Sequence, residues 1–118
     1  MTGKKAQRVE DYIEQIISAI ERIETYVQGV DREAFNKNTL VQDAVIRNFE
    51  IIGEAAIKIQ VADPGFIQRH ARLRLDLAYK MRNALIHGYD TVNTRTIWNT
   101  IVSDLPALKQ QMTKIRQA

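Results

Sequence analysis

The chain has 118 residues, the size of one ordinary domain, so we expect a single domain over residues 1–118 with a core that needs no cross-links. It has no cysteine, which excludes disulfides and thiolate metal sites, and its two histidines, His70 and His87, are too far apart in sequence to suggest zinc. The net charge of +3, from 17 basic and 14 acidic residues, suits a polyanionic partner but does not by itself establish nucleic-acid binding.

The first predicted helix is amphipathic and ends at Gly29. Its apolar residues recur every three or four positions: Val9, Tyr12, Ile13, Ile16, Ile17, Ile20, Ile23 and Val27. A second helix is predicted after the cap candidates Asn38 and Thr39 and stops at Asp63-Pro64-Gly65. These two segments should form a long antiparallel pair.

A third helix is predicted from about Ala71 to His87, with Gly88 as its C-terminal breaker. A fourth contains Ile97, Trp98, Ile101 and Leu105. Asp104 followed by Pro106 suggests the cap and first turn of a last, short helix carrying Leu108, Met112 and Ile115.

Strand signals, internal repeats and linker-like segments are absent from the sequence. We therefore predict an all-α fold, an up-and-down four-helix bundle with an additional short C-terminal helix. No apolar run is long enough to span a membrane, and the basic N-terminus lacks the apolar segment of a signal peptide. We expect a cytoplasmic protein with no membrane partner.

Candidate chemistry is concentrated at the end of the third predicted helix, where Arg82, Asn83, His87 and Tyr89 are close in sequence. Arginine is a permanent, fork-shaped cation suited to phosphate, and histidine can take and give a proton near neutral pH. On one straight helix Arg82 and His87 diverge by roughly 140°, whereas Asn83 and His87 share a face. The pattern indicates phosphodiester chemistry.

Acid–base cleavage of RNA needs one group to deprotonate the ribose 2′-hydroxyl and another to protonate the leaving 5′-oxygen. The chain offers one credible histidine for this purpose. A symmetric dimer that brings together two copies of His87 and of Arg82 would supply acid, base and cation without a metal or cofactor. Self-association would then be a condition of activity.

Simpler interpretations exist for several of the candidate residues. His87 can be a helix-terminal histidine that bonds the last carbonyls, and Arg82 can pair with Asp76 or Asp90. His70 has no comparable neighbours and is more typical of a loop. The basic residues before and within the motif helix can form an ordinary solvated face: Arg69, Arg72, Arg74, Lys80 and Arg82.

The spacing Arg82-x-x-x-x-His87-x-Tyr89, with Asn83 beside the arginine, resembles the signature of the HEPN superfamily, specifically its HepT-like toxins. The likeness covers most of the chain. It includes the blocks Asp11-Tyr12-Ile13 to Ile20-Glu21-Arg22-Ile23, Gln42 to Ala56 and Ile97 to Pro106, in the family's order.

This resemblance implies a helical bundle that forms a homodimer, with a metal-independent endoribonuclease cleft made from Arg82 and His87 of both protomers and supported by Asn83. It implies RNA as substrate and an MntA-like nucleotidyltransferase antitoxin as partner, which neutralises the toxin by adding AMP to the tyrosine matched by Tyr89. Where family members often have Ala-Gly, this chain has Tyr79-Lys80, a larger side chain and an extra cation at the expected dimer seam.

Two other functions fit the same residues. A non-catalytic module could use Arg82 and His87 to hold RNA or a nucleotide without moving protons, and an inert helical subunit could simply assemble with a nucleotidyltransferase. The sequence also leaves open whether Arg47, Asn48 or Glu54 contacts substrate or only supports the cleft.

Overall fold

The computed structural model describes residues 2–70 and 93–117, and within these ranges the chain is helical and contains no β-strand. The all-α fold predicted from the apolar spacing is confirmed. The third predicted helix, residues 71–87, and its breaker Gly88 lie outside the described residues.

Helix α1 (Thr2–Tyr26) is the first predicted helix. Gly29 follows it with a φ of +74°, a left-handed conformation that glycine adopts without the steric cost of a Cβ. The apolar stripe of α1 is buried in the core at Val9, Ile13, Ile16, Ile17, Ile20 and Ile23.

Helix α3 (Thr39–Ala62) begins and ends where the sequence predicts. The Asn38 side chain accepts a hydrogen bond from the Val41 backbone N–H at 3.0 Å, which satisfies one of the free donors at the helix start. At the other end, the backbone N–H of Asp63 donates to the Ile59 carbonyl at 2.8 Å. The Asn38 cap therefore sets the start of α3, and the helix ends before Asp63 because the following Pro64 disfavours a helical conformation there.

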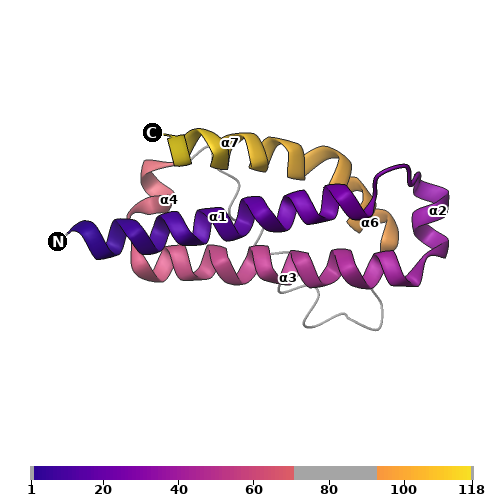
Figure 1. Cartoon of the computed structure of the whole chain (residues 1–118), viewed down its shortest axis with the longest axis horizontal. Coiled ribbons are helices and arrows are strands. Elements are labelled where there is room, and N and C mark those ends of the chain that lie inside the picture. Colours follow the sequence, from indigo (N-terminus) through magenta and orange to yellow (C-terminus); the bar gives the residue numbers. More distant parts are fainter. Residues whose placement is uncertain (1, 71–92, 118) are drawn as a thin grey trace.

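Helix α1 lies between α3 and α7 (Leu105–Gln117), and both run antiparallel to it (Figure 1). The apolar faces of the three helices meet in one core, which excludes water from large aliphatic and aromatic side chains. The fully buried large side chains are Phe35, Phe49, Ile16, Ile20, Ile23, Ile52, Ile59, Met112 and Val45.

Two short helices were not predicted from the sequence. Helix α2 (Arg32–Lys37) is capped by Asp31 and places Phe35 against Trp98, with ring centroids 5.3 Å apart. Helix α4 (Phe66–Arg69) follows α3 directly. Neither segment is long enough to show an apolar period, so their positions depend on what they pack against.

The C-terminal part is helical without interruption from α6 (Thr94–Asn99) through a π-helical turn, η2 (Thr100–Asp104), into α7. The segment after Asp104 is helical, as predicted, but Asp104 does not cap it; this residue belongs to the π turn. The last two predicted helices are thus one continuous run.

Pro106 explains the irregularity of this run. In a regular α-helix a proline ring clashes with the carbonyl four residues earlier, and it has no N–H to donate. Immediately before Pro106, the Leu105 N–H donates to the Thr100 carbonyl, five residues back instead of four. The wider π turn lets the helix continue through the proline.

Candidate functional site

The residues of the predicted catalytic motif, Arg82, Asn83, His87 and Tyr89, lie outside the described residues. Their roles therefore stay predictions. Of the basic group near the motif, only Arg69 is described; the others, Arg72, Arg74 and Lys80, lie outside, as does Tyr79.

Arg69 and His70 form the end of α4. Arg69 makes an ion pair with Asp63, a buried carboxylate at the end of α3. The His70 ring packs on Phe66, with centroids 4.5 Å apart and planes tilted by 42°. Arg69 is thus bound to the turn between α3 and α4 through Asp63. Among the described residues, the contact given for the His70 side chain is with the Phe66 ring, not with another candidate catalytic residue.

Helix α3 carries the polar block whose role the sequence leaves open. Arg47 is exposed and lies 3.6 Å from Glu50 on the same helix. Glu54 is also exposed, whereas the side chain of Asn48 is only 3% exposed. Asn48 is therefore buried in the bundle, and Arg47 and Glu54 are on the surface.

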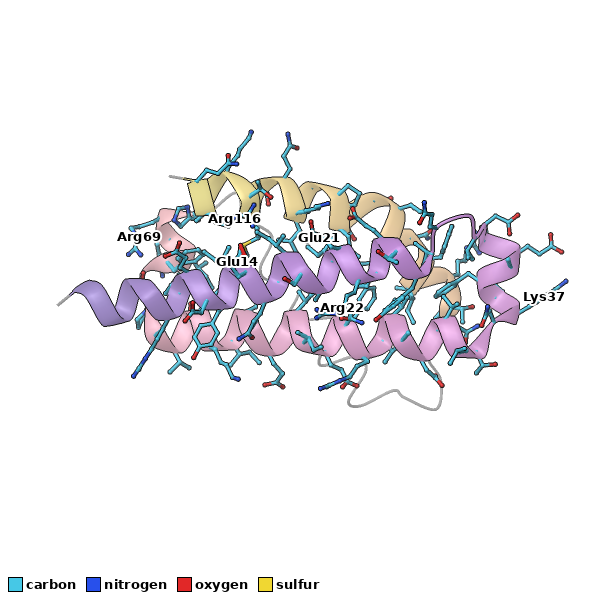
Figure 2. All side chains as sticks on the ribbon, in the orientation of Figure 1. Glu14, Glu21, Arg22, Lys37, Arg69 and Arg116 are labelled. Atoms are coloured by element: carbon cyan, nitrogen blue, oxygen red, sulfur yellow. The ribbon has the colours of Figure 1, made fainter. Side chains whose placement is uncertain are left out.

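The buried amide of Asn48 connects α3 to α1. Its Nδ2 donates to the Ala44 carbonyl at 2.9 Å, and its Oδ1 accepts a hydrogen bond from Arg22 Nε at 2.8 Å. Arg22 is exposed and lies at the seam between the two helices (Figure 2). A neutral amide thus orients a guanidinium at the surface.

The residue pattern did not predict the hydrogen bond that Arg22 makes across the helix pair. One feature of the sequence indicates that Arg22 has no ion-pair partner on its own helix. The positions three and four residues away, where a helix would place such a partner, hold no acidic residue. They are Ser18, Ala19, Thr25 and Tyr26.

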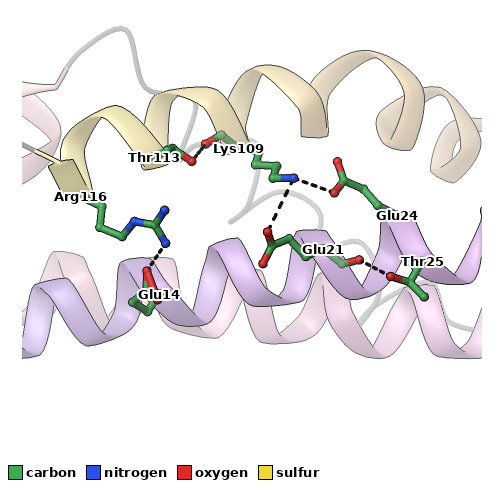
Figure 3. Close-up of polar contacts among 7 residues, drawn as sticks. All are labelled: Glu14, Glu21, Glu24, Thr25, Lys109, Thr113 and Arg116. Atoms are coloured by element: carbon green, nitrogen blue, oxygen red, sulfur yellow. Dashed lines mark hydrogen bonds and ion pairs between the residues drawn. The ribbon is translucent and has the colours of Figure 1, made fainter.

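Two cations of α7, Lys109 and Arg116, form ion pairs that join α7 to α1 (Figure 3). Lys109 Nζ lies 2.9 Å from Glu24 and 3.8 Å from Glu21, and Arg116 pairs with Glu14. The hydrogen bond to Glu24 raises the pKa of Lys109, and the hydrogen bond to Glu14 raises that of Arg116. These charges are matched by carboxylates and contribute to helix packing.

Within residues 2–70 and 93–117, no group of three or more carboxylate or histidine side chains is placed to hold a metal ion. In the same ranges, no helix has the length and apolar character needed to cross a membrane.

Comparison with known proteins agrees with the resemblance seen in the motif. The family described as "Ribonuclease HepT-like" matches residues 16–115, a range that includes Arg22, Asn48 and the predicted motif. No solved structure matches the chain significantly.

Two relatives match this chain over nearly their whole length. A protein of Thermococcus cleftensis named "Probable ribonuclease HepT" is 38% identical over 91% of this chain and 94% of its own. A protein of Caldanaerobacter subterraneus subsp. tengcongensis named "Putative RNase TTE0752" is 35% identical over 90% of this chain and 92% of its own. With the family match over most of its length and a helical fold that agrees, this chain belongs to the HepT-like ribonuclease family.

Proposed function

We propose that this chain is the cytoplasmic toxin of a toxin–antitoxin pair, a metal-independent endoribonuclease that needs no cofactor. The observation that carries the proposal is the family match over residues 16–115, which spans Arg82, Asn83, His87 and Tyr89. The two relatives are named "Probable ribonuclease HepT" and "Putative RNase TTE0752", and these names support the same activity.

In the proposed reaction, the ribose 2′-oxygen attacks phosphorus and the bond to the 5′-oxygen breaks. His87 of one protomer takes the 2′-hydroxyl proton, and His87 of the other gives a proton to the leaving 5′-oxygen. Arg82 stabilises the charge that develops on the phosphoryl oxygens, and Asn83 supports the histidine on its helix face. The products are a 2′,3′-cyclic phosphate and a 5′-hydroxyl.

The proposal requires a homodimer because each chain supplies one such histidine. The rate per protomer should therefore fall when the protein is diluted below its dimer dissociation constant. A rate per protomer that stays constant while analytical ultracentrifugation shows monomers would contradict the composite site.

The decisive experiment is cleavage of end-labelled RNA by purified protein in EDTA. We expect the parent to produce 2′,3′-cyclic phosphate ends and both His87→Ala and Arg82→Ala to lose cleavage. His70→Ala is the matched control, because His70 packs on Phe66 and takes no part in the proposed reaction. Equal cleavage by all variants would indicate a contaminant and favour the non-catalytic RNA-binding module.

We further propose that an MntA-like nucleotidyltransferase antitoxin neutralises the toxin by adding AMP to Tyr89. The phenol oxygen would attack the α-phosphorus of ATP and release pyrophosphate, leaving an anion beside the RNA-binding residues. Protein co-produced with the antitoxin should gain mass in AMP increments, which Tyr89→Phe abolishes and Tyr26→Phe, at an exposed tyrosine of α1, retains. Full inhibition of unmodified protein would show that contact alone suffices.

A further inference from the structure

Asn48 is a buried polar residue among apolar neighbours on α3. The neighbouring α3 residues Val45, Phe49 and Ile52 are buried, and Asn48 itself is 3% exposed. Removing an amide from water is costly unless its hydrogen bonds are replaced. Here they are replaced by Ala44, within α3, and by Arg22, across the helix pair.

The hydrogen bond at Arg22 differs from those of the ion-paired arginines. Arg47, Arg69 and Arg116 each have a carboxylate partner, which offsets their charge. Arg22 is bound through Nε to a neutral amide, so that partner orients the guanidinium without offsetting its charge. The result is a fixed positive group on the surface between α1 and α3.

A guanidinium oriented in this way is suited to a phosphate. Arginine carries five N–H donors, and the bond to Asn48 uses only the one on Nε. The two terminal nitrogens present a planar fork that matches two phosphoryl oxygens, and holding Nε in place reduces the entropy lost on binding. A carboxylate on a partner protein would fit the same fork, but the proposed substrate of this family member is a polyanion of phosphates.

We propose that Arg22 binds a backbone phosphate of the RNA substrate and that Asn48 is the positioning residue that presents its guanidinium. This proposal rests on the proposed ribonuclease function and adds to it a substrate contact on α1, outside the predicted motif. It also gives a reason for a buried amide at position 48, where an aliphatic side chain would pack without desolvating a polar group.

The test measures binding of a fluorescent single-stranded RNA oligonucleotide by anisotropy at several salt concentrations, in a His87→Ala background that keeps the RNA intact. Arg22→Gln should weaken binding about tenfold or more, since a hydrogen-bonded charge pair is lost. It should also lower the slope of log affinity against log salt by about 0.7, the value for one phosphate contact on a single strand. Arg32→Gln, an exposed arginine on α2, removes the same charge and should change neither.

Two further variants separate orientation from charge. Arg22→Lys keeps the charge but loses Nε and the fork, and Asn48→Leu keeps Arg22 but removes the amide. Both should weaken binding less than Arg22→Gln and leave the salt slope near that of the parent. If Arg22→Lys and Asn48→Leu bind RNA as the parent does, Asn48 has only a packing role and the proposal is wrong.

The outcomes separate this proposal from the ribonuclease function. If the parent cleaves RNA but Arg22→Gln equals Arg32→Gln in affinity and slope, Arg22 is not a substrate contact and the function stands. If Arg22→Gln instead weakens self-association or antitoxin binding at unchanged RNA affinity, the fork serves a protein interface and the proposal also fails. If the parent does not cleave RNA but Arg22→Gln still weakens RNA binding, the phosphate contact is supported and the proposed ribonuclease activity is wrong.

Discussion

Replacing Phe35 with alanine should remove the main attachment of α2 to the rest of the bundle. Phe35 is the one buried residue of this six-residue helix, its side chain is 0% exposed, and its ring lies 5.3 Å from that of Trp98 at an interplanar angle of 38°. A helix this short has little stability of its own, so its position depends on this side chain.

The expected loss is about 3–5 kcal/mol in the free energy of unfolding, the usual range for truncating a fully buried phenylalanine. This value includes the lost burial, the cavity and the aromatic contact with Trp98. Since ordinary domains are stable by about 5–15 kcal/mol, the variant should stay folded at low temperature but with a much reduced margin.

Urea unfolding followed by far-ultraviolet circular dichroism measures the loss. Trp98, the chain's single tryptophan, gives a second readout, because its emission should shift in the folded variant when the neighbouring ring is removed. Leu40→Ala is the control, since Leu40 is 79% exposed and its truncation should cost no more than about 0.5 kcal/mol. A loss below about 1 kcal/mol for Phe35→Ala would refute the packing described for α2.

Three further predictions concern helix ends and the contact between α1 and α7. Lys109→Met should cost at most about 1 kcal/mol at neutral pH, because the ion pairs are partly exposed. The hydrogen bond to Glu24 raises the pKa of Lys109 above 10.5. The stabilisation from these ion pairs is therefore complete below pH 10.5 and is lost as the pH rises through the raised pKa. A stability difference between parent and variant that persists in strong alkali would contradict this. Asn38→Ala should cost about 1 kcal/mol in urea unfolding by removing the α3 cap, and an unchanged midpoint would mean that the cap contributes nothing. Gly29→Ala should cost about 1–2 kcal/mol through backbone strain alone, since no atom lies within 4 Å of the added Cβ, and thermal unfolding would reveal it.

Much of the fold could be predicted because its signals are local. Each of these signals acts within a few residues: the apolar stripe of α1, the glycine at position 29 and the cap at Asn38. In the structure, α1 ends shortly before Gly29 and α3 begins directly after Asn38. The short helices α2 and α4 could not be predicted in this way, because too few residues are present to show a period and their stability comes from distant partners.

In the candidate site, too, the residues close together in sequence could be predicted, whereas those that depend on packing could not. The motif from Arg82 to Tyr89 is contiguous in sequence, so its residue types and their spacing are enough to indicate phosphodiester chemistry and the family. Arg47, Asn48 and Glu54 could not be assigned, since burial distinguishes a supporting residue from a surface residue only after α3 has packed.

The sequence by itself determined the all-α class, the ends of α1 and α3 and the membership suggested by the motif, because helix period, capping and motif spacing are properties of neighbouring residues. Only the tertiary structure decided that the chain continues as a helix through Pro106, that Phe35 meets Trp98, and that Asn48 orients an arginine 26 residues away. These features arise from contacts between segments far apart in the chain, whose geometry exists only after the helices have packed.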